Sequence, residues 1–117
     1  MLSHQELLTL KQGLESERVE FKPSTSQSSP IRRAICAFAN DLPGQGQTGI
    51  LFVGLKDDGS CSQIQITDEV LRQLADWALG GDILPRPDVE VYQSELEGCE
   101  VAIVEVRPSA QPPVRYR

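Results

Sequence analysis

Alternating hydrophobic and polar positions mark the first strand of this chain. In residues 19–22, Val19 and Phe21 alternate with Glu20 and Lys22, which is the two-residue period of a half-buried strand. Successive side chains of a strand point to opposite faces, so Val19 and Phe21 would be buried on one side of a sheet. Glu20 and Lys22 are therefore expected to share the other side.

Three segments have the periodicity and the end signals of helices. The first begins with Ser3 and Glu6 at capping-box spacing and ends near Gly13. The second begins at Ser29 and Pro30, with Pro30 at the first helical position, and ends at residue 40, and the third begins at Thr67 and ends before a glycine pair. The apolar faces of the second and third helices consist of Ile31, Ala34, Ile35 and Phe38, and of Val70, Leu71, Leu74, Ala75 and Ala78.

The remaining hydrophobic segments predict three more strands. Residues 49–55 form an apolar run with the character of a buried central strand, and residues 89–92 and 100–106 are expected to pair as a hairpin. The prolines at 85, 87, 108, 112 and 113 are expected to interrupt regular structure. This order of elements predicts an α+β fold in which helices pack on a small mixed sheet.

The length and composition predict one soluble domain. A chain of 117 residues, 39% hydrophobic and 24% charged, has room for a single hydrophobic core and is not typical of disordered chains. We expect one domain over residues 1–117, with an N-terminal helix in 1–13 and a truncated C-terminal segment in 108–117. Neither an apolar run long enough to span a membrane nor a signal peptide is apparent, so a cytoplasmic location is expected.

The three cysteines are widely spaced and odd in number. Cys36, Cys61 and Cys99 form no C-x-x-C pair, and the chain has one histidine. This pattern argues against a structural zinc site and against a disulfide framework. All three are therefore expected to be free thiols.

The charge is unevenly distributed along the chain. The formal net charge of −6 argues against general affinity for nucleic acid, which requires excess Lys and Arg. Residues 1–35 hold five basic and four acidic side chains, residues 36–106 hold three and thirteen, and residues 107–117 hold three arginines and no acid. A basic face is therefore expected only if the two ends of the chain meet in space.

Several short motifs suggest chemistry, and each also has a simpler interpretation. Residues 44–49 match G-x-G-x-x-G, but they follow a helix and precede a strand, the reverse of a dinucleotide-binding fingerprint, so a flexible turn is favoured. Asp57 and Asp58 precede Gly59, which is typical of a turn, although strand ends also carry binding sites. Arg32 and Arg33 at a helix start are either a solvated face or part of an anion site.

Taken together, four blocks of this sequence resemble the Schlafen AlbA-type domain, once labelled a divergent AAA-type ATPase. The blocks are E-x4-E-F-K at 15–22, I-C-A-F-A-N at 35–40, G-I-L-F-V-G at 49–54 and D-D-G at 57–59. The resemblance implies a mixed α/β core. It also implies a bacterial regulator that binds DNA or ATP, of which this chain looks like a fragment. Related eukaryotic domains include endoribonucleases that cut tRNA and rRNA.

The same resemblance implies a set of site residues. An acidic triad of those nucleases matches Glu15, Glu20 and Asp58, which would hold Mg²⁺ or Mn²⁺, and Lys22 would contact a phosphate oxygen. Glu15 and Glu20 would lie on opposite faces of one regular strand, so Glu15 is expected in a bend before the strand.

The favoured function is a nucleic-acid-binding module of a transcriptional regulator. Its phosphate contacts would come from Lys22, Arg32, Arg33, Asn40 and the arginines near the C-terminus. The alternatives are a metal-dependent endoribonuclease, an ATP-binding module and a dimerising scaffold. A homodimer is compatible with each of these functions. Convergence of the three acidic side chains would favour the nuclease, and their dispersal the binding module.

Overall fold

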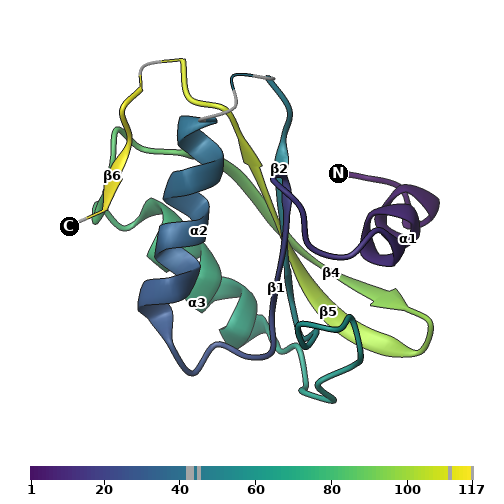
Figure 1. Cartoon of the computed structure of the whole chain (residues 1–117). Helices are drawn as coiled ribbons and strands as arrows, with labels where there is room; N and C mark the ends of the chain where they lie inside the picture. The colour runs from purple at the N-terminus through teal and green to yellow at the C-terminus, as the bar shows by residue number, and fades with distance from the viewer. Residues whose placement is uncertain (42–43, 45, 111, 117) are drawn as a thin grey trace.

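The computed structural model describes residues 1–41, 44, 46–110 and 112–116. Within them, three helices pack on a four-stranded sheet, and a separate two-stranded sheet lies next to the second and third helices (Figure 1). The helices are α1 (His4–Gln12), α2 (Ser28–Asn40) and α3 (Asp68–Leu79). The strands are β1 (Val19–Lys22), β2 (Gly49–Val53), β3 (Ile83–Leu84), β4 (Asp88–Leu96), β5 (Cys99–Arg107) and β6 (Arg115–Tyr116).

The main sheet is mixed, with the strand order β1-β2-β5-β4. Strands β1 and β2 are parallel, whereas β2, β5 and β4 pair antiparallel in succession. The parallel pair requires a crossover, which α2 supplies, and the antiparallel pair β4–β5 is joined by a tight turn. The α+β fold predicted from the sequence is thereby confirmed.

The sheet separates two hydrophobic clusters. Leu51 and Val53 of β2 face α2 and α3, whereas Ile50 and Phe52 of the same strand face the side that α1 covers. Figure 1 shows α2 and α3 on one side of the sheet and α1 on the other. All five residues of β2 are buried because both faces of this central strand are covered.

Strand β1 has the predicted alternation and lies at an edge of the sheet. Val19 and Phe21 are buried in the cluster beneath α1, and the ring of Phe21 packs edge-on against Phe52, with centroids 5.5 Å apart. Glu20 and Lys22 therefore point to the side of the sheet that carries α2. Among the described strands β1 pairs with β2 alone, so these two side chains lie on an edge strand of the sheet.

Most predicted helix ends are confirmed. Ser3 and Glu6 form the capping box of α1, and the Thr67 side chain accepts a hydrogen bond from Val70 N at the start of α3. The predicted start of α2 at Pro30 was two residues late, because the helix begins at Ser28. The small sheet formed by β3 and β6 was not predicted, because two-residue strands have no measurable period.

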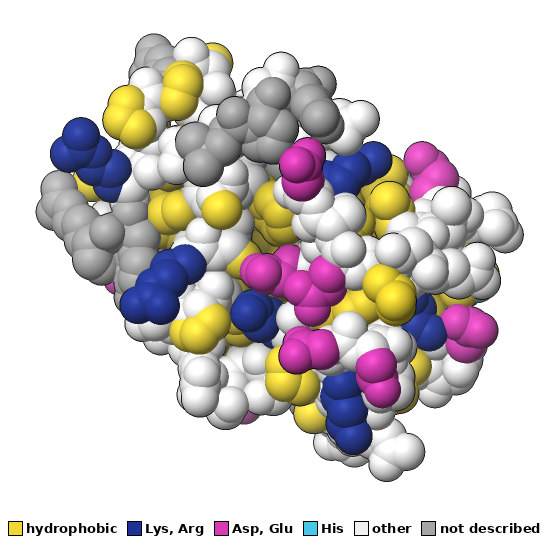
Figure 2. Space-filling model, viewed as in Figure 1, with side chains coloured by type: hydrophobic (Ala, Val, Ile, Leu, Met, Phe, Trp, Pro, Cys, Tyr) yellow, Lys and Arg dark blue, Asp and Glu magenta, His cyan; other side chains and the backbone are white. Residues whose placement is uncertain are grey.

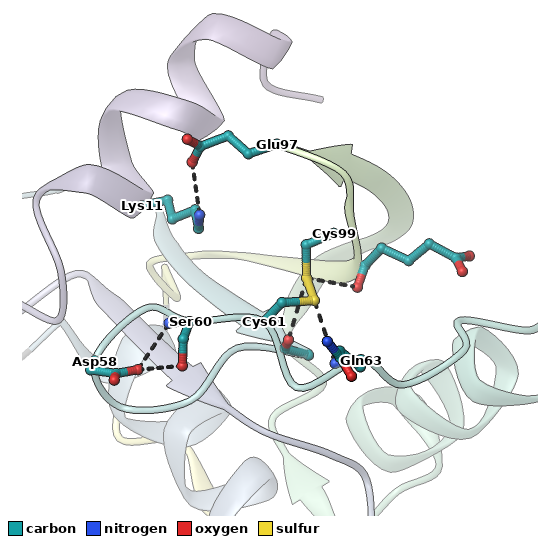
Figure 3. The surroundings of a disulfide bond; sticks show 9 residues. Lys11, Asp58, Ser60, Cys61, Gln63, Glu97 and Cys99 are labelled. Carbon is teal, nitrogen blue, oxygen red and sulfur yellow. Dashed lines mark hydrogen bonds and ion pairs between the residues drawn. A yellow bond between two sulfur atoms is a disulfide. The ribbon is translucent and has the colours of Figure 1, made fainter.

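The prediction of three free thiols was wrong, because Cys61 and Cys99 form a disulfide bond. The segment after β2 folds back on itself, with Ser62 N donating to Gly54 O at 2.9 Å, and this brings Cys61 to the first residue of β5. Figure 3 shows the bond joining the loop of Asp58 and Ser60 to that strand. Cys36 is a free and buried thiol, as predicted.

The C-terminal segment is fastened to the end of α2. The Asn40 side chain donates to Val114 O at 2.9 Å and accepts from Val114 N at 2.6 Å, while Ser109 N donates to Ala39 O at 2.7 Å.

None of the described helices is long and apolar enough to cross a membrane.

Candidate functional site

A pocket of about 560 Å³ lies between α2 and β1. The β1 side contributes Glu20 and Lys22, and Arg33 comes from α2. Figure 2 shows acidic side chains near the middle of this face, close to basic side chains and to a hollow with an apolar floor. The remaining lining residues are Ser16 and Glu17 before β1, and Pro30, Ala34, Ala37 and Phe38 of α2.

The bend before β1 carries Glu15 and Glu17. Leu14 has a positive φ of 61°, and Ser16 N donates to Val19 O at 2.9 Å, so the chain turns sharply into the strand. Glu15 lies in this bend, where the sequence placed it, and Glu17 lines the pocket.

Glu15 belongs to a patch of like charges. Partial burial raises the pKa of the Glu15 carboxyl, the negative charges of Glu20 and Asp57 raise it further, and the Lys22 ammonium lowers it. Of the two adjacent aspartates in the D-D-G turn, Asp57 is the one whose charge contributes to this shift, while the resemblance implied Asp58 as the third site residue.

The Asp58 carboxylate is used within its own turn. It accepts hydrogen bonds from Ser60 N at 2.9 Å and Ser60 Oγ at 2.6 Å, and these bonds lower the pKa of Asp58. Among the residues that the structure describes, no group of three His, Cys, Asp or Glu side chains is placed to hold a metal ion. The described residues therefore show no arrangement of Glu15, Glu20 and Asp58 that could hold a metal ion, and the metal site stays a prediction.

The two adjacent arginines of α2 have different surroundings. The Arg32 guanidinium lies 3.5 Å from Asp82 and 5.7 Å from the centre of the Trp77 ring, so it bridges α2 to the α3–β3 region. Arg33 is exposed and lines the pocket, because successive helical residues point about 100° apart. Within the described part of the chain, neither Arg33 nor Lys22 takes part in a salt bridge.

Asn40 and Arg115 are not among the residues that line the pocket. Both polar atoms of the Asn40 amide bond to the backbone of Val114, which gives this side chain a structural role. Arg115 is in β6 and Arg117 lies outside the described residues, as do parts of the G-x-G-x-x-G segment. Of the proposed phosphate contacts, the structure brings together Lys22 and Arg33.

Sequence reasoning missed the apolar wall of the pocket. Phe38 was predicted on the apolar face of its helix; it is half-buried against the core and also lines the pocket with two alanines of the same helix. Pro30, Arg33, Ala34 and Ala37 recur at the i, i+3, i+4, i+7 spacing of one helical face. This stripe was visible in the sequence, but nothing there showed that it lines a pocket together with residues of β1.

Comparison with known proteins places the chain in a family. The sequence model of the family described as "Schlafen, AlbA_2" matches residues 15–117, so α1 precedes the matched segment. No curated protein sequence matches.

Two solved structures share the fold. One is the N-terminal domain of a Nitrosomonas europaea protein described as related to the ATP-dependent DNA helicase RecG, with a TM-score of 0.60 and 25% identity over 95% of this chain and 76% of that one. The other is the DIP2311 protein of Corynebacterium diphtheriae, with a TM-score of 0.60 and 18% identity over 97% of this chain and 27% of that one. With its family match over residues 15–117, this chain belongs to the Schlafen AlbA_2 family.

Proposed function

We propose that this domain binds nucleic acid at the pocket between α2 and β1, with Lys22 and Arg33 contacting backbone phosphates. The observation that carries the proposal is the position of these two cations on opposite walls of one pocket, outside the salt bridges of the described residues. Membership of the Schlafen AlbA_2 family and the likeness to a RecG-related domain support the same class of ligand.

The charge of the domain limits how it binds. With a net charge of −6, it would be repelled by nucleic acid everywhere except at a local basic site. Two phosphate contacts would give a shallow salt dependence, with a slope of log K against log salt of about −1.4 for single strands and about −1.8 for duplexes. Binding is therefore expected to be weak and local.

Charge removal at the pocket tests the proposal. The double variant Lys22→Ala/Arg33→Ala is expected to lose at least about tenfold in affinity for labelled oligonucleotides, because each phosphate contact contributes mainly electrostatic free energy. Fluorescence anisotropy at salt concentrations from about 20 mM to about 200 mM would measure the affinity and its salt dependence. Arg72→Ala, an exposed substitution on α3, is the matched control and should bind like the wild type. Equal binding by the double variant and the wild type would refute the assignment of the site.

Metal-dependent RNA cleavage is the second function that the sequence suggested. The described residues provide the acidic patch of Glu15, Glu20 and Asp57, but no set of three ligands around a common point. The binding function is therefore the one that the geometry supports best. ATP binding and a regulatory role were implied by the family resemblance, and no further observation on this structure favours either of them.

A further inference from the structure

We infer that the α2–β1 pocket accepts one unpaired nucleotide, with its base against Phe38 and the alanines of α2 and its amino edge toward Glu20. This inference rests on the proposed function and names the ligand class of the same site. It predicts that single strands bind better than duplexes, and that cytosine is preferred over uracil.

The size of the pocket fits one nucleotide. A volume of about 560 Å³ lies within the range of 300–1,000 Å³ that holds drug-sized ligands. A paired base is stacked inside its duplex and cannot enter such a pocket without unpairing, which costs a few kcal/mol. An unpaired base enters without that cost, so the shape favours single strands.

The two walls of the pocket differ in chemistry. The α2 wall is apolar and consists of Pro30, Ala34, Ala37 and Phe38, whereas the β1 wall presents Glu20 and Lys22. The two alanines leave room beside the Phe38 ring, and that ring packs directly on Gly49. A base has an apolar face and a polar edge, and stacking on an aromatic ring contributes about 1–3 kcal/mol per base.

The charged groups distinguish the parts of the nucleotide. Lys22 and Arg33 are donors and suit the phosphate, whereas an ionised Glu20 carboxylate only accepts hydrogen bonds. Cytosine presents an amino donor at its N4 position, where uracil, like thymine, presents a carbonyl acceptor. The two bases have nearly the same size, so the carboxylate should favour cytosine by charge and hydrogen bonding alone.

The test compares two labelled single strands of equal length, oligodeoxycytidine and oligodeoxyuridine octamers, with a duplex of the same length. At one low salt concentration, the wild-type protein is expected to bind the cytidine octamer at least about fivefold more tightly than the uridine octamer, as one good base contact gives. The duplex is expected to bind more weakly than the cytidine octamer. In Glu20→Gln the cytidine preference should vanish while binding persists, because an amide can donate to the uracil carbonyl.

A second variant tests the stacking wall. Phe38→Leu keeps an apolar side chain but removes the aromatic face, so binding of both octamers should weaken by about fivefold or more while circular dichroism shows an intact fold. Equal affinity for the two octamers, or tighter binding of the duplex, would overturn the nucleotide inference. If binding still depends on Lys22 and Arg33 in that case, the proposed function stands; if no oligonucleotide binds, both fail.

Discussion

Removing the disulfide between Cys61 and Cys99 is expected to lower the free energy of unfolding by about 3–4 kcal/mol. The bond closes a loop with a sequence separation of 38, and without it the unfolded chain regains the conformational entropy of that loop. The measurement is urea unfolding of the Cys61→Ala/Cys99→Ala variant and of the oxidised wild type. Such a loss is a large part of the stability of a domain of this size.

The disulfide also supports the acidic end of the candidate site. It fastens the loop that carries Asp57 and Gly59, and Gly59 lies against Leu14 and Phe21 at the entry to β1. Freeing this loop should weaken the contribution of the Asp57 charge to the raised pKa of Glu15, so this pKa should fall, while the contributions of burial and of Glu20 remain. Titration of Glu15 by NMR in the variant would detect the change.

Cys36 provides the control for this experiment. The Cys36→Ala variant keeps the disulfide, so a thiol reductant should destabilise it by as much as it destabilises the wild type. In the wild-type protein, thiol counting should find one free cysteine before reduction and three after it. Unfolding at the same urea concentration with and without reductant, despite those counts, would contradict the stabilising role.

Replacing Gly49 by alanine is expected to destabilise the domain by about 1–3 kcal/mol, the range for overpacking in a well-packed interior. A Cβ atom at this position would lie 2.1 Å from Cγ of Phe38, and 2.5 Å from its Cβ and Cδ1, so the ring must move. Gly49 is the first residue of the buried central strand and pairs with Val106, so its backbone cannot shift to relieve the clash.

The same substitution should alter the pocket, because Phe38 lines it. Thermal unfolding and octamer binding are the two measurements, and both are expected to be impaired. Gly13→Ala is the matched control: its φ of −74° suits alanine, and the nearest atom to its Cβ would be Leu10 O at 3.5 Å. A Gly49→Ala protein as stable as the Gly13→Ala protein would show that the Phe38 ring is not held as described.

The elements with a clear period could be predicted from the sequence. The alternation of Val19, Glu20, Phe21 and Lys22 correctly placed two side chains on each face, because pleating enforces this whatever the rest of the fold. The caps at Ser3 and Thr67 are equally local, since each bonds within one turn of its helix.

The features that could not be predicted depend on tertiary contacts or on the geometry of a single turn. Cys61 meets Cys99 only because the loop after β2 folds onto β5. Asp57 and Asp58 are adjacent in sequence, but Ser60 donates two hydrogen bonds to Asp58, whereas the charge of Asp57 raises the pKa of Glu15. Arg32 and Arg33 likewise became distinguishable only once Asp82 and Trp77 were placed beside α2.

The central claim is that nucleic acid binds in the pocket between α2 and β1. The most direct measurement is a titration of the ¹⁵N-labelled domain with the cytidine octamer, followed by two-dimensional NMR. The predicted result is that amide shifts concentrate at Lys22, Arg33 and Phe38, while the amides of Arg72 on α3 and Gln93 on β4 stay in place. Shifts centred on α3 or β4, with the pocket amides unmoved at saturation, would contradict the claim.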